Sequence, residues 1–493
     1  SLVLFMISSY NKRITSKRRK SMKVCFIAAE AAPFVKVGGL GDVIGSLPKA
    51  LRELGVDARV ILPLYSSIDR ERFGLKYKAY QFVDLGWRHS YCGIFETEVD
   101  GVPCYFVDNE QYFNRDSIYG QADDGERFAF FSKAALEILP ALDFKPDVVN
   151  VNDWHTALSV IYLDVLKSRE AEFYKDMKSV LSIHNIEFQG RFNPYEMGNL
   201  FGLENKYFDA LIYNGDVNLL KGAIQLADRV NTVSETYARE ILDPYFSYGL
   251  DKILTVEQGK LRGILNGIDI VKFNPKTDPV IPVNYDLETF EDKVQNKLAF
   301  QKEMDLEVNA DIPLIGMVTR LTHQKGIDLI LQASEEILKT GAQLVILGTG
   351  DAHYESALRS LEHYRHDRVR SILLFSNEMS AKIYAASDLF LMPSKTEPCG
   401  LSQLISMRYG TVPVVHRVGG LHDTVIPFTG VEGNGFTFES FQAGDMMDAI
   451  YRAVTCFYQS PDEWKQIIKN NLQKDVSWEQ SAKKYLDLYH EVV

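Results

Sequence analysis

The chain has 493 residues, more than one hydrophobic core usually fills, so two domains are expected. Its formal net charge of -12 disfavours nucleic acid and anionic membranes as partners, because both carry negative charge. The five cysteines show neither a paired metal-ligand spacing nor a disulfide framework, which favours a reducing compartment, and the apolar runs are too short for a transmembrane helix.

The first segment, residues 1–21, is basic and lacks acidic side chains. We expect the folded part to begin near Met22. The leader is interpreted as a disordered or mistranslated extension, or as an organelle-targeting segment rich in Arg and Ser. A secretory signal fits poorly, because the apolar stretch at residues 2–7 precedes the basic run.

The next segment combines an apolar run at residues 24–29, a glycine loop at residues 36–42 (KVGGLGD) and a helical pattern. This order predicts strand, loop and helix. Backbone N–H groups in such a loop can approach a phosphate at the helix N-terminus, and Lys36 adds a mobile positive charge. The expected ligand is therefore an anion carried by a nucleotide. The spacing matches neither the dinucleotide fingerprint nor the P-loop, so these standard motifs do not apply.

Short β-rich runs then alternate with helical patterns along the rest of the chain. In the first half, further strands are predicted at residues 58–64, 147–151, 179–183 and 229–233. In the second half they are predicted at residues 314–318, 344–347, 371–375, 389–392 and 412–415, with a helix at 327–338. This alternation predicts an α/β fold of two doubly wound domains, each with a parallel sheet covered on both faces, and a hinge at the proline-bearing stretch 273–292.

Polar motifs follow several of these strands, where ligands of doubly wound sheets bind. Arg320 and Lys325 follow one strand and predict a second anion site, or else a solvated basic turn. Glu397 follows another strand and is expected to hold sugar hydroxyls or to cap a helix. His184 is favoured as functional, whereas His155 is favoured as structural. Gly419 and Gly420 could add phosphate-binding N–H groups.

No HExxH, DxD or carboxylate cluster of metal-binding type stands out, so a metal-independent mechanism is favoured. No GxSxG or cysteine nucleophile motif is visible either.

Six motifs in one order (KVGGLGD, NDWH, IHN, NGID, RLTHQKG and SKTEPCGL) resemble the bacterial-type glycogen (starch) synthase family, which comprises ADP-glucose-dependent retaining glycosyltransferases. The resemblance covers nearly the whole chain after Met22. It implies a GT-B fold, with two Rossmann-like domains facing across a cleft. The implied domains are residues 22–265 on the acceptor side, residues 266–475 on the donor side, and a helix at 476–493 that returns to the N-terminal domain.

The reaction implied by this resemblance transfers glucose from ADP-glucose to the non-reducing end of an α-1,4-glucan, with retention of configuration and no metal or other cofactor. The resemblance gives catalytic roles to Asp153, His184, Arg320, Lys325 and Glu397. It gives substrate contacts to Lys36, Gly38, Gly39, Asp42, Asn266, Cys399, Gly400, Leu401, Gly419 and Gly420. The expected location is the bacterial cytoplasm, or a plastid if residues 1–21 are a targeting segment.

The sequence departs from the family pattern at Val418, where relatives usually place Thr, and around Phe375, where base stacking is expected to change. Ile405 replaces the second Glu of a neighbouring glycosyltransferase family and argues against that family. The alternative function is a non-catalytic glucan-binding or regulatory protein on the same fold. An epimerase or phosphorylase is a further enzyme alternative, and a dehydrogenase is disfavoured because GxGxxG is missing.

Overall fold

The structure is a computed structural model that describes residues 21–169 and 171–493. Apart from Ser21, the expected basic leader 1–21 lies outside the described residues. Contacts divide the chain into two compact units. The first unit runs to Leu181 and adds Gln189–Arg229 and Tyr485–Val493, whereas the second comprises Ser182–Phe188 and Val230–Lys484.

A nine-stranded sheet has the strand order β12-β11-β7-β6-β1-β2-β5-β4-β3. Its central strand β1 is buried and pairs in parallel with β2 and β6, as its continuous apolar sequence predicts. The strands are β1 (Lys23–Ile27), β2 (Asp57–Pro63), β3 (Lys76–Leu85), β4 (Arg88–Val99), β5 (Val102–Asp108), β6 (Val148–Asn152), β7 (Lys178–Ile183), β11 (Arg229–Thr232) and β12 (Leu261–Gly263).

One edge of this sheet is antiparallel, which corrects the prediction of a parallel sheet. β3 and β4 form a hairpin, and β4 also pairs antiparallel with β5. Along β3 the exposed Tyr80 and Phe82 alternate with the buried Val83 and Leu85, because only one face of the hairpin packs on the core. That period-two pattern was the available sequence signal, and the prediction did not use it.

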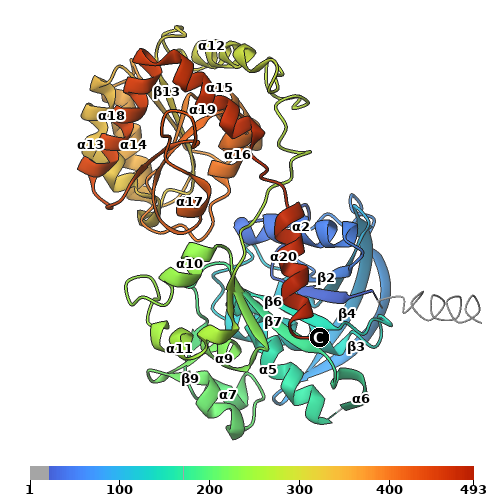
Figure 1. Ribbon diagram of the computed structural model, residues 1–493. Helices are drawn as coiled ribbons and strands as arrows, with labels where there is room; N and C mark the ends of the chain where they lie inside the picture. The colour runs from blue at the N-terminus through green and yellow to red at the C-terminus, as the bar shows by residue number, and fades with distance from the viewer. Residues whose placement is uncertain (1–20, 170) are drawn as a thin grey trace, which may run out of the picture. The chain divides into compact units, whose positions relative to one another are not determined.

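In the first unit, α2, α4 and α5 pack against strands of the nine-stranded sheet, and further helices complete the unit (Figure 1). They are α2 (Gly39–Glu53), α3 (Glu110–Phe113), α4 (Asp124–Glu137), α5 (Asp153–Arg169), α6 (Ala171–Tyr174), α7 (Glu196–Asn199), α8 (Phe208–Leu211) and α9 (Leu219–Leu226). A small antiparallel sheet has the order β8-β10-β9, with β8 (Arg191–Phe192), β9 (Ile212–Tyr213) and β10 (Asp216–Asn218). The last helix, α20 (Glu479–His490), brings Tyr489 to β6, where its hydroxyl donates to Asn150 Oδ1 at 2.6 Å.

The second unit contains a fully parallel six-stranded sheet with the order β15-β14-β13-β16-β17-β18. Numbered along the chain, this order is 3-2-1-4-5-6, the order of a Rossmann sheet. The strands are β13 (Leu314–Val318), β14 (Gln343–Leu347), β15 (Val369–Ile372), β16 (Leu389–Met392), β17 (Val412–His416) and β18 (Phe436–Phe438). The doubly wound prediction is confirmed here, and four of the five predicted strands agree to within one residue.

Helices cover both faces of this sheet (Figure 1) and enclose apolar clusters on each side. The helices of the second unit are α10 (Glu235–Glu240), α11 (Asp251–Val256), α12 (Lys293–Glu303), α13 (Ile327–Lys339), α14 (Ala352–Tyr364), α15 (Asn377–Ala386), α16 (Ser402–Arg408), α17 (Gly419–Thr424), α18 (Ala443–Gln459) and α19 (Pro461–Gln473).

The proline-bearing stretch expected to be a hinge lies within the second unit and is anchored to the end of α16. The Tyr285 hydroxyl donates to the Tyr409 carbonyl at 2.6 Å, and the Tyr409 hydroxyl donates to Asp278 Oδ2 at 2.6 Å. Both tyrosines are buried. This stretch therefore contributes to the core of the second unit.

Each sheet has a switch point, at which the connections leave in opposite directions from two adjacent strands. In the six-stranded sheet it lies between β13 and β16, and in the nine-stranded sheet it lies between β1 and β6. Ligands of doubly wound sheets bind beyond the carboxyl ends of such strands. Four of the six motifs quoted above, KVGGLGD, NDWH, RLTHQKG and SKTEPCGL, follow these four strands.

Candidate active site

The loops that follow β13 and β16 bring Lys325 and Glu397 into contact, although 72 positions separate them. Lys325 Nζ lies 2.8 Å from Glu397 Oε2 and 3.0 Å from Oε1. The Ser394 hydroxyl donates to Oε2 at 2.9 Å. Glu397 is only 6% exposed, and its negative charge is compensated by Lys325. The lysine itself remains partly open to solvent. The sequence predicted both residues but not their pairing.

Gly326 allows these two loops to approach each other. Its φ of 75° is left-handed, and a Cβ at this position would lie 2.1 Å from the Pro393 carbonyl oxygen. The Lys395 N–H also donates to the Gln324 carbonyl at 2.8 Å. Arg320, at the start of the same loop, is exposed. An accessible guanidinium thus lies in the same loop as a lysine that is already paired with a carboxylate.

The glycine pair before α17 packs directly on the turn that carries Glu397. A Cβ on Gly419 would lie 1.8 Å from the Glu397 carbonyl oxygen, and one on Gly420 would lie 2.0 Å from the Cys399 carbonyl oxygen. The Gly420 N–H donates to the Glu397 carbonyl at 3.0 Å, and the Gly419 N–H donates to Glu240 Oε1 at 2.8 Å. Protein acceptors therefore occupy both N–H groups that the sequence argument offered to phosphate.

Glu240 was missed by the sequence analysis. Its second carboxylate oxygen is buried and has no hydrogen-bond partner among the described residues, and burial raises the pKa of this carboxyl to about 7. The N–H of Gly419 lowers this pKa, and the nearby Asp423 raises it. No motif surrounds Glu240 in the sequence, so only the fold reveals this contact.

Asn266 and the residues after Glu397 form the adjoining wall of the site. The Asn266 N–H donates to the Cys399 sulfur, and Asn266 Oδ1 is buried with no hydrogen-bond partner in residues 21–169 and 171–493. Burial raises the pKa of the Cys399 thiol to about 12, so this cysteine is not a nucleophile at neutral pH. Gly400 has a left-handed φ of 77°, and Leu401 precedes the first residue of α16.

His184 follows β7 in a segment that belongs to the second unit. Its side chain is partly exposed, yet its dense surroundings lower its pKa to about 4. The ring is therefore neutral at pH 7, and it can donate or accept a hydrogen bond without carrying charge. Within the same unit, Gln324 Nε2 contacts Glu187 Oε2, which connects the His184 segment to the loop of Lys325.

Asp153 directly follows β6 and begins α5 with a φ of 57°. Left-handed φ is uncommon for a residue other than glycine and often marks a functional position. The neighbouring His155 contacts the rings of Tyr119 and Trp154, and its buried Nδ1 has no hydrogen-bond partner in the part of the chain that the structure describes. Burial lowers the pKa of His155 to about 3. This environment agrees with the structural interpretation of His155.

The glycine loop after β1 differs from the expectation in one important respect. The carboxylate of Glu30 accepts the N–H groups of Val37 at 2.9 Å, Gly38 at 3.1 Å and Gly41 at 3.0 Å. An internal carboxylate thus occupies the anion position at the N-terminus of α2. Lys36 Nζ forms an ion pair with Asp42 Oδ2 at 2.7 Å, so these two candidate residues lie together. Gly39 is the first residue of α2.

The positions that depart from the family pattern have distinct environments. Phe375 is 76% exposed and follows β15, which ends at Ile372; the strand predicted to reach residue 375 is therefore wrong at its end. Ser376 caps α15, since its hydroxyl accepts the Met379 N–H at 3.0 Å. Val418 is buried immediately before the glycine pair.

Residues 23–256 match the family model of the starch synthase catalytic domain, and residues 301–472 match glycosyl transferases group 1. The glycogen synthase of Clostridium botulinum (strain Alaska E43 / Type E3) is 47% identical over 477 residues, which cover 96% of this chain and 99% of that protein. The chain belongs to the glycogen (starch) synthase family. Another family member, the glycogen synthase of Bacillus licheniformis, is 50% identical over 474 residues, with 95% and 98% of the two chains covered.

Solved structures agree with this membership. The catalytic domain of starch synthase IV from Arabidopsis thaliana, bound to ADP and acarbose, has a TM-score of 0.90 and 35% identity, with 96% of this chain and 99% of that chain covered. Sucrose-phosphate synthase from Thermosynechococcus elongatus has a TM-score of 0.60 at 17% identity and shares the fold alone. The GT-B class predicted from the family motifs is confirmed.

In residues 21–169 and 171–493, no cluster of three or more His, Cys, Asp and Glu side chains is arranged to hold a metal ion. Over those same residues, no helix has the length and apolar character needed to cross a membrane. All five cysteines are buried and free.

Proposed function

We propose that this member of the glycogen (starch) synthase family is an ADP-glucose:α-1,4-glucan 4-α-glucosyltransferase. It transfers glucose from ADP-glucose to the non-reducing end of an α-1,4-glucan, with retention of configuration and without a metal ion or cofactor. The observation that carries this proposal is the ion pair between the partly exposed Lys325 and the buried Glu397 at the β13/β16 switch point, with the exposed Arg320 in the loop of Lys325. The catalytic domain of starch synthase IV, which is bound to ADP and acarbose, supports both substrates.

In this proposal the cations act on the leaving group. Negative charge grows on the departing diphosphate as the glycosidic bond breaks, and Arg320 and Lys325 stabilise that charge more strongly in the transition state than in the ground state. Arg320 grips phosphate oxygens through its planar guanidinium, and Lys325 acts as a point charge. Lys36, Gly38, Gly39 and Asp42 contact the donor, and so do Gly419 and Gly420.

The sugar is held by the other candidate residues. Glu397 accepts hydrogen bonds from glucose hydroxyls and supports positive charge on the ring, and Asn266, Cys399, Gly400 and Leu401 line the same position. His184, neutral at pH 7 because its pKa is about 4, donates a hydrogen bond near the anomeric carbon. Asp153 contacts the acceptor. We favour front-face attack, since no second carboxylate is assigned as a nucleophile.

We also propose the domain ranges 22–265, 266–475 and 476–493 given above, and a cytoplasmic location, or a plastid if residues 1–21 are a targeting segment. The matches name catalytic members of the family, and none favours the alternative of a non-catalytic glucan-binding protein.

The deciding experiment incubates the purified chain and glycogen with radiolabelled ADP-glucose or UDP-glucose, in the presence of EDTA, and counts label in precipitated polymer. Incorporation from ADP-glucose alone supports the proposal and its donor. Incorporation from UDP-glucose alone would change the donor, and a requirement for added metal would refute metal independence. Glycogen binding without incorporation from either donor would favour the non-catalytic alternative.

A further inference from the structure

Glu30 is a buried acid that the sequence analysis did not single out. It follows β1, and only 2% of its surface is exposed. Three backbone N–H groups donate to its carboxylate, from Val37, Gly38 and Gly41. The helix α2 begins in this loop, and its N-cap residue Gly38 has no side chain that could satisfy the first N–H groups. The Glu30 carboxylate therefore takes the place of an N-cap side chain, although Glu30 lies eight residues before the N-cap position Gly38.

A tyrosine hydroxyl from another segment also contacts Glu30. The Tyr119 hydroxyl donates a hydrogen bond to the Glu30 carboxylate. The Tyr65 hydroxyl donates to the Ala29 carbonyl at 2.7 Å and so holds the backbone next to Glu30. The carboxylate is thereby held between the glycine loop on one side and the segment around Tyr119 on the other.

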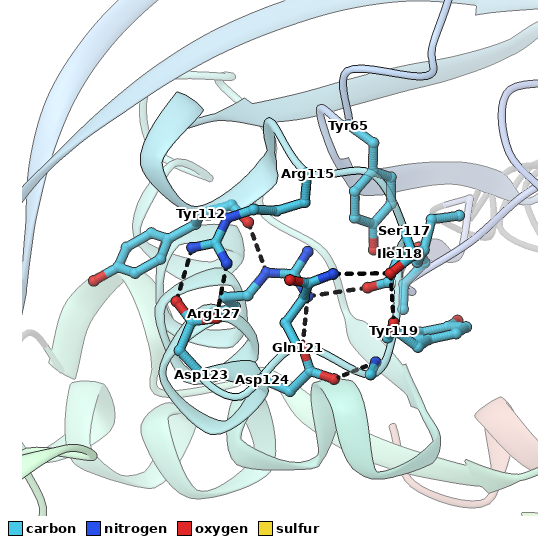
Figure 2. A network of polar contacts seen from close by, with 12 residues as sticks. Tyr65, Tyr112, Arg115, Ser117, Ile118, Tyr119, Gln121, Asp123, Asp124 and Arg127 are labelled. Carbon is cyan, nitrogen blue, oxygen red and sulfur yellow. Dashed lines mark hydrogen bonds and ion pairs between the residues drawn. The ribbon is translucent and has the colours of Figure 1, made fainter.

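The segment around Tyr119 is itself tied down by a polar network (Figure 2). Arg127 is fully buried on α4, and its Nη1 donates to the Ile118 carbonyl at 3.0 Å and to Asp124 Oδ1 at 2.6 Å. Asp124 Oδ2 accepts the Gly120 N–H at 2.8 Å. These contacts fix the backbone on both sides of Tyr119, so its hydroxyl is directed at Glu30 by α4.

We propose that Glu30 is a positioning residue, which fixes the glycine loop so that Lys36 is presented to the donor. This inference rests on the proposed function, in which Lys36 contacts ADP-glucose. Lys36 lies next to the first of the three bonded N–H groups, and in this structure it pairs with Asp42 on the first turn of α2. Three N–H groups of the loop donate to Glu30 and are not available to a phosphate. In this proposal the loop contributes the positioned ammonium group of Lys36 instead.

The variant Glu30→Gln tests the inference, because an amide nitrogen cannot accept an N–H bond and at least one of the loop contacts is lost. We expect the KM for ADP-glucose to rise roughly tenfold, as for loss of a hydrogen bond to a charged group, while the KM for glycogen stays unchanged. The matched control is Asp147→Asn. Asp147 accepts the Lys23 N–H at 2.8 Å at the other end of β1, and its replacement leaves the donor KM unchanged.

A double-mutant cycle with Lys36→Ala separates positioning from a general structural effect. If Glu30 acts through Lys36, Glu30→Gln raises the donor KM in the parent chain but changes it by less than about twofold in the Lys36→Ala background. An equal rise in both backgrounds overturns the inference. A normal donor KM in Glu30→Gln, alongside a raised KM in Lys36→Ala, overturns the inference alone. If Lys36→Ala leaves the KM for ADP-glucose unchanged, the donor role of Lys36 in the proposed function is overturned as well.

A milder variant covers the case in which Glu30→Gln does not fold. Tyr119→Phe removes one hydroxyl donor from Glu30 and leaves the three N–H bonds in place. The same cycle with Lys36→Ala then applies, and we expect a smaller rise in donor KM that disappears without Lys36. A Tyr119→Phe enzyme with an unchanged donor KM would contradict the positioning network.

Discussion

The buried charges of two glutamates in this chain are compensated by different kinds of group, and this difference determines what each glutamate can do. Glu397 is compensated by the Lys325 ammonium and the Ser394 hydroxyl. Glu30 is compensated by backbone N–H groups and a tyrosine hydroxyl. A lysine can exchange its partner for a substrate phosphate, whereas three backbone groups fixed in one loop cannot readily do so. We therefore assign chemistry to the first pair and positioning to the second.

The Lys325–Glu397 pair gives the first residue-scale prediction. Lys325→Ala leaves the Glu397 carboxylate buried without its cation, so we expect the free energy of unfolding to fall by about 2–4 kcal/mol. We expect kcat/KM to fall by at least about 100-fold, since transition-state charge is no longer stabilised. Urea unfolding and glucosyl transfer to glycogen measure the two effects.

The control for this variant is Lys382→Ala. Lys382 pairs with Glu303, whose side chain is 41% exposed, so we expect a loss below about 1 kcal/mol and normal turnover. A Lys325→Ala enzyme that turns over at the normal rate would contradict the catalytic assignment.

The lowered pKa of His155 gives a prediction on pH. Unfolding returns this pKa from about 3 to its ordinary value near 6.5, so the unfolded chain binds the proton between these limits. The contribution of the neutral, buried His155 ring to the free energy of unfolding is therefore fully present above pH 6.5. It is lost as the pH falls toward 3, because the unfolded chain then binds the proton. Between pH 7.5 and 5.0 we expect this residue to account for about 1–2 kcal/mol of lost stability.

His155→Phe removes this titration while keeping a ring against Tyr119 and Trp154. The difference in unfolding free energy between pH 7.5 and 5.0 should then shrink by that amount. An unchanged pH dependence in the variant would show that the pKa of His155 stays near its ordinary value in the folded chain, contrary to the lowering expected from burial.

At the scale of elements, the loops between strands and helices require glycine for steric reasons. Gly326→Ala places a Cβ against the Pro393 carbonyl and strains a left-handed residue at the start of α13. We expect the unfolding free energy to fall by about 2–4 kcal/mol and activity to fall with it, because Lys325 shifts. Chemical denaturation and the transfer assay measure both.

Gly444→Ala is the matched control, since a Cβ there meets no atom within 4 Å. This glycine is the second residue of α18, so alanine should raise stability by about 0.5 kcal/mol through helix propensity. If Gly326→Ala were as harmless as this control, the close approach of the β13 and β16 loops would be refuted.

The element-scale predictions from sequence succeeded where strands are buried on both faces. β13, β16 and β17 are continuous apolar runs bounded by polar loops, and their ends were located to within a residue. The prediction was wrong at β15, because Leu374 and Phe375 continue an apolar run but lie exposed beyond the last hydrogen-bonded residue. An apolar run does not show where pairing with a neighbouring strand ends.

At the scale of the whole chain, the last residues belong with the first part of the sequence. Tyr485, Leu488 and Tyr489 are buried in the first unit, and Arg229 pairs with Glu491 at 3.0 Å. A chain that stops after Lys484 should lose about 4 kcal/mol or more of stability in that unit, from the apolar area of these side chains. Thermal unfolding measures this loss.

A chain that stops after Glu491 is the control, because it loses only Val492 and Val493, the last of which is 63% exposed. We expect this control to unfold like the full chain. If both truncations behaved alike, the C-terminal helix would not contribute to the first unit.

The sequence by itself determined the local units of this protein. The strand, loop and helix around residues 23–53 and 314–339 follow from apolar periodicity and from glycines at turns, which depend only on neighbouring residues. It also determined the family, because six ordered motifs are specific even without a fold. The candidate residues Arg320, Lys325 and Glu397 were found in this way, each after a strand.

Only the tertiary structure decided which groups meet. Lys325 reaches Glu397 across 72 positions, and Tyr489 reaches Asn150 across 339. It also gave the glycine-loop N–H groups to Glu30 and the Gly419 N–H to Glu240, where the sequence argument expected phosphate. The physical reason is that hydrogen bonds and ion pairs depend on distances in space, and those distances are set by strand order and sheet packing rather than by spacing along the chain.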